Sequence, residues 1–337
     1  MAPLLASRLN SYLPSPATGG LQQLQRQSLL HNLRLSAHLL QLLRALEASG
    51  IPSIPFKGPV LSERLYGDAA LRQSSDLDLI VRPEDLPQAL ATLQSLGFER
   101  EYAISPERIP ALMANSFEIA LTRDGIHVDL HWDVMPRFYG IPFDLHAAWL
   151  RSRRVDAAGT QVLEFSPEDH FLALALHSSK HFWAKLIWLS DLRQLIFLNP
   201  ALDWDLLLER ARMMRVENIL TITLALLRDV LGVEPNAPAI LERLSPEQDC
   251  HWRAAYEMAR RNLCSPHPEI EGLRTYRFFL RARDTRSDAV RQVFRHAFTP
   301  SSSELFKSER SIPAHMHLPV HLWRLVTKFL SFLWNSL

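Results

Sequence analysis

The chain is poor in the features that mark several classes of protein. Its 337 residues include only two cysteines, Cys250 and Cys264, which give neither a disulfide framework nor a zinc-ligand spacing and favour a reducing compartment. The formal net charge is only +1, so the whole molecule has no strong attraction for nucleic acid. Internal repeats and long low-complexity segments are also missing. We therefore expect an ordinary globular protein of the cytoplasm.

Long uninterrupted apolar runs are missing as well. Residues 1–20 contain three prolines and no continuous apolar core, so they do not read as a secretory signal. No window reaches the ~20 uncharged apolar residues that a membrane span needs. The nearest, 318–337, carries three basic side chains. We predict an amphipathic helix over 311–337 that packs on the protein, with peripheral contact to a membrane as the alternative.

Composition and periodicity divide the chain into four parts. Residues 1–50 are expected to form an N-terminal helical segment, in which leucines at helical spacing predict one long helix over 21–49. Residues 51–166 alternate short extended runs with helical patterns, whereas 167–310 contain helical patterns only. Together with 311–337, this organisation predicts an α+β protein: a core built on a small mixed β-sheet, an N-terminal helix and a C-terminal helical domain.

Local signals are clearest in the second part. A strand is predicted over 77–81, and Asp124-Gly125 is a strong turn signal between two alternating strands over 116–122 and 126–132. The helical part then predicts helices over 167–181, 183–198, 203–213, 216–231, 238–245, 251–263 and 273–297. The core should therefore contain a hairpin next to a strand that comes from an earlier part of the chain.

Two carboxylates alternate at the start of the predicted strand. Asp76 and Asp78 share one face of it, which costs free energy unless a cation lies between them. Asp is depleted in strands, so this placement favours function, and Mg²⁺ is the ion that prefers such hard oxygen ligands, with Mn²⁺ as a substitute. Asp129, in the middle of a hairpin strand, is the third carboxylate expected at the site. Because like charges crowd there, Asp78→Asn should leave metal-free stability unchanged or raised.

Polar and cationic residues around these carboxylates are candidates for binding a nucleotide. The predicted contacts are Lys57, Gly58, Arg72, Ser75 and His131. Lys57 is followed by a glycine that lets the backbone approach a phosphate closely. Arg72 suits bidentate phosphate contact, with an ion pair to a neighbouring Asp as an equal alternative. His131 shares a strand face with Asp129.

As an ordered set, these motifs resemble the polymerase β-type nucleotidyltransferase superfamily. They are more closely similar to an uncharacterised bacterial nucleotidyltransferase family, a resemblance that covers about 51–200. The motifs are Lys57-Gly58, Arg72, Ser75-Asp76-Leu-Asp78, Val128-Asp129-Leu-His131-Trp132, Ser166-Pro-Glu-Asp, His177-Ser-Ser-Lys180-His181 and Trp188-Leu-Ser-Asp191. The wider superfamily usually places Gly-Ser at the first turn, where this chain has Lys57-Gly58-Pro59.

The resemblance implies a nucleotidyltransferase core that moves a nucleoside monophosphate from an NTP, such as ATP, to an acceptor and releases pyrophosphate. Asp76 and Asp78 would hold the nucleotide-bound Mg²⁺, and Asp129 would help to hold a second ion or accept the acceptor's proton. The acceptor could be a small molecule, a peptide or a tRNA end. The alternative is a non-catalytic binding or scaffold protein of the same fold, with a membrane-peripheral location as one version of it.

Other polar residues have simpler interpretations. His177 and His181 lack the third ligand of a zinc site and are interpreted as a polar helix face packed on the sheet, with nucleotide contact by Lys180 or His181 as the alternative. Seven arginines between 274 and 295 face only two aspartates. A solvated helix face is the simpler explanation of this basic segment, and contact with RNA or anionic lipid is the alternative.

Overall fold

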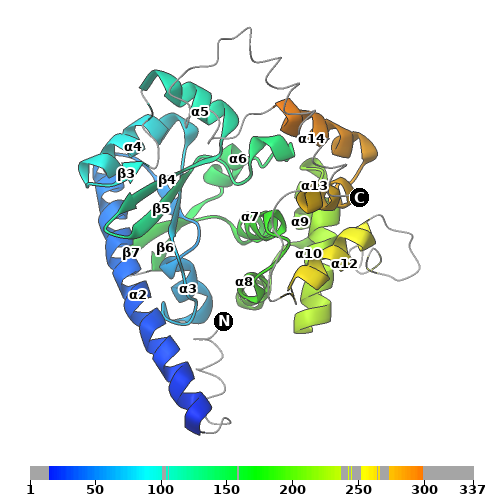
Figure 1. The fold of residues 1–337 in the computed structure, drawn as a ribbon, viewed down its shortest axis with the longest axis horizontal. Helices are drawn as coiled ribbons and strands as arrows, with labels where there is room; N and C mark the ends of the chain where they lie inside the picture. Colours follow the sequence, from blue (N-terminus) through cyan, green and yellow to red (C-terminus); the bar gives the residue numbers. More distant parts are fainter. Residues whose placement is uncertain are drawn as a thin grey trace.

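The computed structural model describes residues 15–100, 104, 106–157, 159–236, 242, 244, 252–263, 265 and 273–298. It has the predicted α+β architecture, with a mixed sheet in the N-terminal part and, among the described residues after 166, helices without strands. Figure 1 shows the sheet beside the long first helix, with the later helices on the opposite side. Among the described residues, no helix combines the length and the apolar character needed to cross a membrane.

The sheet-containing part alternates strands with short helices. Its strands are β1 (Ser53–Pro55), β2 (Leu77–Val81), β3 (Glu99–Arg100), β4 (Glu118–Arg123), β5 (Ile126–His131), β6 (Arg153–Ala157) and β7 (Thr160–Glu164). Its helices are α2 (Ser15–Ala48), α3 (Pro59–Tyr66), α4 (Leu86–Ser95), α5 (Ile109–Asn115) and α6 (Leu145–Leu150). Single 3-10 turns lie at η1 (Pro83–Asp85), η2 (Pro106–Arg108) and η3 (Arg137–Tyr139).

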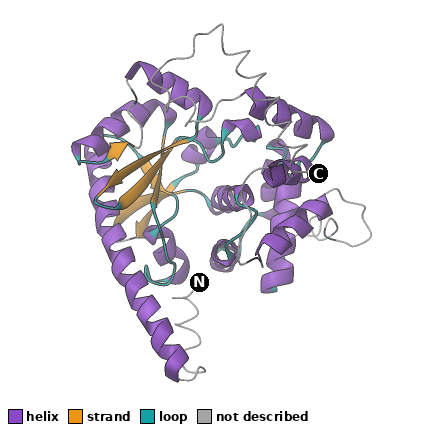
Figure 2. Ribbon diagram, in the orientation of Figure 1, coloured by secondary structure: helices purple, strands orange, loops and turns teal. Residues whose placement is uncertain are grey.

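Helices alone make up the rest of the described chain, as Figure 2 shows by colour. They are α7 (Pro167–Lys180), α8 (Leu186–Leu198), α9 (Trp204–Met213), α10 (Glu217–Leu231), α12 (Trp252–Leu263), α13 (Leu273–Ala282) and α14 (Arg286–Phe298). The start of α7 follows the local sequence closely, because Ser166 accepts a hydrogen bond from the Asp169 amide and Pro167 occupies the first turn.

Strand order determines which residues meet. The main sheet runs β1-β2-β5-β4-β3, and β6 pairs with β7 separately. The hairpin predicted around Asp124-Gly125 is β4–β5, and its second strand lies parallel to β2. All other neighbours in the sheet are antiparallel. The parallel pairing places Asp78 directly opposite Asp129.

The two faces of the sheet contact different parts of the protein. Leu77 and Leu79 of β2 and Leu130 of β5 belong to one hydrophobic cluster together with buried residues of α2 and α4. Ile80, one position out of phase with these leucines, belongs to a second cluster with residues of α7, α8 and α10. Alternation along a strand therefore sends the carboxylates of β2 and β5 toward the face covered by the later helices.

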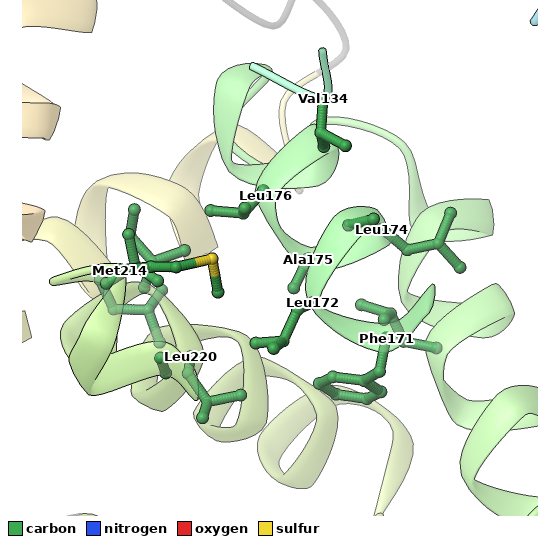
Figure 3. Packing of buried hydrophobic residues seen from close by; sticks show 14 of the residues in the cluster. Val134, Phe171, Leu172, Leu174, Ala175, Leu176, Met214 and Leu220 are labelled. Atoms are coloured by element: carbon green, nitrogen blue, oxygen red, sulfur yellow. The ribbon is translucent and has the colours of Figure 1, made fainter. Parts of the chain in front are cut away.

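The second cluster forms the core of the helical part. Figure 3 shows Phe171, Leu172 and Ala175 of α7 packed near Met214 and Leu220. These side chains are at most 6 % exposed. Because the cluster also contains residues of β1 and β2, α7 is held firmly against the sheet, where its polar residues can reach the carboxylates.

The observed helices differ from the predicted ones at two places. The single helix predicted over 273–297 is wrong: α13 and α14 are separate, because the Thr285 hydroxyl caps α14 by accepting from the Asp288 amide at 3.1 Å. Helices α5 and α6 were not predicted, since both are short. Most of 238–245 and all of 311–337 lie outside the described residues. The domain boundaries at residues 50, 166 and 310 stay a prediction.

Candidate active site

The candidate site lies where β2 and β5 run side by side. Asp78 and Asp129 are in register on these parallel strands, and both alternate with buried apolar residues. One ligand atom from each of Asp78, Asp129 and His131 lies within 4.8 Å of the other two. Of the three carboxylates predicted to converge, Asp78 and Asp129 lie in this group because their strands pair in parallel.

Asp78 is the most deeply buried of these residues, at 3 % exposed. Its Oδ1 accepts from the Lys57 ammonium at 2.8 Å and from Nε2 of His131 at 3.0 Å. Burial alone would raise the pKa of Asp78, but Lys57 and His131 outweigh it and hold that pKa well below its usual range. The other oxygen, Oδ2, is buried and has no hydrogen-bond partner among the described residues.

Asp129 has the opposite electrostatic surroundings. Burial and the neighbouring Asp78 carboxylate raise the pKa of Asp129 to about 6, with smaller contributions from Glu118 and Asp76. The charge of His131 lowers the pKa of Asp129 but does not outweigh these causes. Two carboxylates that face each other across one strand pair therefore differ in their affinity for a proton.

Asp76 and Ser75 lie just before β2 rather than within it. Asp76 is partly exposed and accepts from the exposed Ser75 hydroxyl at 3.1 Å. Its carboxylate is not part of the close group formed by Asp78, Asp129 and His131, although its charge contributes to the pKa of Asp129. The roles of Asp76 as a metal ligand and of Ser75 as a nucleotide contact stay predictions.

The Lys57-Gly58 turn leads the chain from β1 into α3. Gly58 has a φ of 80°, which residues with a side chain rarely adopt, and Pro59 fills the first helical turn. A Cβ on Gly58 would lie 3.5 Å from the carbonyl oxygen of Asp76. That distance is an ordinary contact, so the positive φ is what requires glycine here, and the turn places the Lys57 ammonium at Asp78.

His131 connects the site to the hairpin. Its Nε2 faces Asp78, and its Nδ1 lies 3.3 Å from a carboxylate oxygen of Glu118 on β4. Glu118 and His131 are opposite each other in the β4–β5 pairing. Glu118 was not predicted as a site residue, although the two-residue turn at Asp124-Gly125 sets the register that places it opposite His131.

Helix α7 brings a group of basic and aromatic side chains to the same site. The Lys57 ammonium lies 3.3 Å from Nε2 of His177, and burial together with Lys57 lowers the pKa of His177 well below its ordinary value. His177 contacts the rings of His181 and Trp188, with ring centroids 5.1 and 5.4 Å away. The interpretation of this helix face as packed on the sheet is consistent with these contacts.

Lys180 lies one turn after His177 at the end of α7. Its ammonium lies 4.6 Å from the ring centroid of Phe117, and burial lowers its pKa. The chain then turns sharply, because Phe182 and Trp183 both have φ near 50°, a conformation that is uncommon for residues with a side chain. Trp183 is completely buried, so packing stabilises this strained turn and fixes the end of α7.

Arg72 is placed differently from the expectation of a phosphate clamp. Its Nε lies 2.9 and 3.1 Å from the two carboxylate oxygens of Asp191 on α8, and both side chains are almost fully buried. Asp191 also accepts from the Tyr66 hydroxyl at 2.9 Å. The observed contact is therefore an ion pair, as in the second interpretation of Arg72. Its partner lies 119 residues away in the sequence and is not a neighbouring Asp. A direct contact between Arg72 and a nucleotide stays a prediction.

Asn32 of α2 is a second anchor of the same loop. Its side-chain amide donates to the carbonyl oxygen of Arg72 at 2.8 Å, and its Oδ1 accepts from the Ser74 amide at 3.3 Å. Asn32 is fully buried in a helix whose other buried residues are almost all leucines. That contrast was a usable signal, because a buried amide must have hydrogen-bond partners. Asn32 and Asp191 together hold the loop that leads to Asp76.

The residues present fit a hard divalent cation. Asp78 offers a buried carboxylate oxygen without a hydrogen-bond partner among the described residues, and a carboxylate oxygen of Asp129 lies within 4.8 Å of a carboxylate oxygen of Asp78. Carboxylate oxygens are the ligands that Mg²⁺ and Mn²⁺ prefer. Both ring nitrogens of His131 already face carboxylates, so this donor set is better suited to such an ion than to zinc.

Comparison with known proteins gives one family. A family described as "Uncharacterised nucleotidyltransferase" matches residues 1–232, from the N-terminal helix to the end of α10. Neither the curated proteins nor the solved structures give a match. The match covers more than two thirds of the chain and contains every residue of the candidate site. The chain therefore belongs to this uncharacterised nucleotidyltransferase family, a group of transferases.

Proposed function

We propose that this protein transfers a nucleoside monophosphate from an NTP to an acceptor and releases pyrophosphate, with Mg²⁺ or Mn²⁺ as cofactor. The observation that carries the proposal is the register of Asp78 and Asp129 on adjacent parallel strands, with a buried oxygen of Asp78 free of hydrogen bonds among the described residues. Polymerase β-type transferases, which the motifs resemble, use carboxylates in this way. Family membership supports the same class of reaction.

Asp78 and Asp129 would hold the cation, with Asp76 as a further ligand from the chain just before β2. When bound, the cation neutralises the charge that develops on the phosphate oxygens during in-line attack. Asp129 could also accept the proton of the attacking hydroxyl group. A carboxylate whose pKa is raised to about 6 remains ionised at neutral pH and is a better proton acceptor than an ordinary Asp.

Lys57 would bind the triphosphate beside the cation. Its ammonium is 2.8 Å from Asp78 in the absence of ligand, so it already neutralises the metal-binding carboxylate. It therefore stabilises the free site and supplies positive charge where a phosphate would bind. The adjacent Gly58 allows close approach of the backbone, and Ser75 and His131 line the same region.

Arg72 would contribute to the reaction indirectly, by positioning the loop that carries Ser75 and Asp76. Its guanidinium is committed to Asp191, and a direct clamp on the triphosphate would require this buried pair to open. We therefore assign Arg72 a positioning role for the loop that carries Ser75 and Asp76. The acceptor could be a small molecule, a peptide or a tRNA end, and the chain's near-neutral charge does not select among them.

Labelling by each of four α-³²P NTPs tests this reaction. The full chain is incubated with Mg²⁺ and, separately, with cellular RNA, protein and metabolite fractions, and label transferred to any fraction is measured. Asp78→Asn and Asp129→Asn should abolish transfer. Asp205→Asn, the same change at an exposed carboxylate on α9, should leave it intact.

The rival function is a binding or scaffold protein that keeps this fold without catalysis. Because Lys57 and His131 already satisfy one oxygen of Asp78, the site is stable without a metal, as a scaffold would require. Absence of label transfer to every fraction, together with NTP binding that is the same with and without Mg²⁺, would establish the scaffold and reject the transferase.

A further inference from the structure

A second polar pocket, of about 290 Å³, lies in the helical part of the chain. It is formed by α14, the end of α13, the turn between α9 and α10, and the segment around η3. Its charged and amide side chains are Arg215, Arg283, Asp288, Arg291, Gln292 and Arg295. None of them belongs to the candidate active site. All except Arg215 lie beyond residue 232, where the match to the family ends.

Arg283 is the residue that distinguishes this pocket from a solvated basic surface. It is only 5 % exposed, and its Nε and Nη1 have no hydrogen-bond partner among the described residues. Burial lowers the pKa of Arg283, because the aspartates nearby only partly compensate the lost hydration. A buried guanidinium with unpaired N–H groups costs free energy of folding, so a bound anion is the natural partner for it.

The balance of charge in the pocket also favours an anion. Asp288 is the single carboxylate among the lining residues, against four guanidinium groups. The Asp288 carboxylate lies 2.7 Å from the guanidinium of Arg215 and 3.5 Å from that of Arg291. It also accepts a hydrogen bond from the Thr285 hydroxyl. The adjacent Asp284 accepts from two backbone amides at the start of α10. Positive charge therefore remains in excess.

The backbone around the pocket is shaped to hold these arginines. Arg215 has a φ of 56°, a conformation in which glycine or asparagine is more usual. Gly140, which lines the pocket, also has a positive φ, and a Cβ there would lie only 3.0 Å from Nη1 of Arg295. A side chain at residue 140 would therefore displace this guanidinium. Both positive φ angles occur at helix ends, after η3 and after α9, and they place Gly140 and Arg215 at the wall of the pocket.

Gln292 adds a different kind of unsatisfied group. It is 5 % exposed, and its side-chain oxygen has no hydrogen-bond partner among the described residues. An oxygen acceptor in a pocket of arginines gains no hydrogen bond from an anion without a hydroxyl group. It suits a molecule that carries a hydroxyl group as well as negative charge.

We propose that this pocket binds a small phosphomonoester, with Arg283 and its neighbouring arginines on the phosphate and Gln292 on a hydroxyl of the same molecule. Guanidinium groups suit phosphate oxygens because they offer paired donors in one plane. The burial of Arg283 favours a compact ligand over the backbone of a nucleic acid, which would contact the exposed arginines first. The proposal is independent of the reaction at Asp78 and Asp129.

Isothermal titration calorimetry of the full chain in EDTA tests this site. The probes are ribose 5-phosphate, inorganic phosphate and ribose. Ribose 5-phosphate should bind saturably, inorganic phosphate more weakly, and ribose not at all. Arg283→Met should weaken ribose 5-phosphate binding by about tenfold or more, since a hydrogen bond to a charged group is lost. Gln292→Leu should weaken binding of ribose 5-phosphate more than binding of inorganic phosphate, because the free ion lacks the sugar hydroxyl.

Matched variants control for charge and for the other site. Arg286→Gln removes an exposed arginine at the start of α14 outside the pocket and should leave binding unchanged. Lys57→Ala should also leave it unchanged, because Lys57 belongs to the active site. The melting temperature of ligand-free Arg283→Met should equal or exceed that of the wild type, since an unpaired buried charge is removed.

Three results would overturn the proposal. The first is the absence of saturable binding by both phosphate probes. The second is binding of ribose 5-phosphate that survives Arg283→Met. A lower melting temperature of Arg283→Met, combined with unchanged binding by Arg291→Gln, would count in the same way, because the arginines would then be structural. The third is tight binding of a single-stranded RNA oligomer that depends on Arg283 while ribose 5-phosphate does not compete, which would make the site a nucleic-acid contact.

Discussion

Asp78 and Asp129 lie opposite each other across the parallel β2–β5 pair, yet their carboxylates have contrasting partners. The Asp78 carboxylate contacts the Lys57 ammonium at 2.8 Å and Nε2 of His131 at 3.0 Å. For Asp129, burial and the charge of Asp78 raise the pKa instead. A cation bound between them would relieve the cost of ionising Asp129 without requiring new structure around Asp78. Together with His131, the pair forms a group of side chains that could hold a metal ion.

The Asp78→Asn variant should lose stability in the absence of metal. The sequence alone led us to expect unchanged or higher stability, because it showed the crowded carboxylates but not the ammonium beside them. With the Lys57–Asp78 pair present, the change leaves a buried cation without its partner and should cost about 3 kcal/mol. Urea unfolding in EDTA measures this, and an unchanged free energy of unfolding would show that the pair contributes nothing.

Asp129→Asn should have the opposite effect on the same measurement. Its raised pKa means that the folded protein holds this carboxylate ionised at a cost near neutral pH, and the amide removes that cost. We expect a gain of about 1 kcal/mol, since partial exposure reduces the effect. Transfer activity should nevertheless be abolished. A loss of stability would instead indicate that Asp129 has a structural partner.

Lys57→Ala should weaken NTP binding in Mg²⁺. The loss should become smaller as salt rises, because screening weakens phosphate contacts in the wild type. Fluorescence titration with each NTP at 50 and 500 mM salt measures this, and His127→Ala, an exposed position on β5, serves as the control. Unchanged NTP affinity with a reduced affinity for the acceptor would reassign Lys57 to the other substrate.

Arg72→Ala and Asp191→Asn should each destabilise the protein by about 3–5 kcal/mol, because each leaves a buried charge unpaired. A double-mutant cycle should give a strong coupling energy, since the two changes remove one interaction. If Arg72 acts by positioning its loop, Asp191→Asn will lower transfer activity as much as Arg72→Lys does. Activity that is lost in Arg72→Lys but intact in Asp191→Asn would support the direct phosphate clamp.

Histidine burial should make the protein less stable at mildly acidic pH. Burial lowers the pKa of His170, so the folded state resists a proton that the unfolded chain accepts near pH 6.5. Its contribution is present above that pH and is lost as pH falls below it, with a slope of at most about 1.4 kcal/mol per pH unit. Urea unfolding at pH 7.5 and 5.5 should show a smaller difference for His170→Gln than for wild type. Equal differences would contradict this.

The sequence determined the local framework of the site by short-range rules. The Gly58-Pro59 pair specified a turn and a helix start, and Asp124-Gly125 specified the hairpin, because these residues favour particular backbone angles over a few positions. Strand alternation also predicted that Asp129 and His131 share a face. These features depend on neighbours in the chain, so they can be read without knowing the fold.

The tertiary structure alone decided how the charges are paired. Asp191 is 119 residues from Arg72, and His177 is 120 residues from Lys57, so nothing local indicated either contact. The expectation for Asp78→Asn reversed sign for the same reason, because packing of the Lys57 turn against β2 brings an ammonium to a carboxylate. In a buried site the partner of a charge decides its energy, and partners come from the fold rather than from sequence spacing.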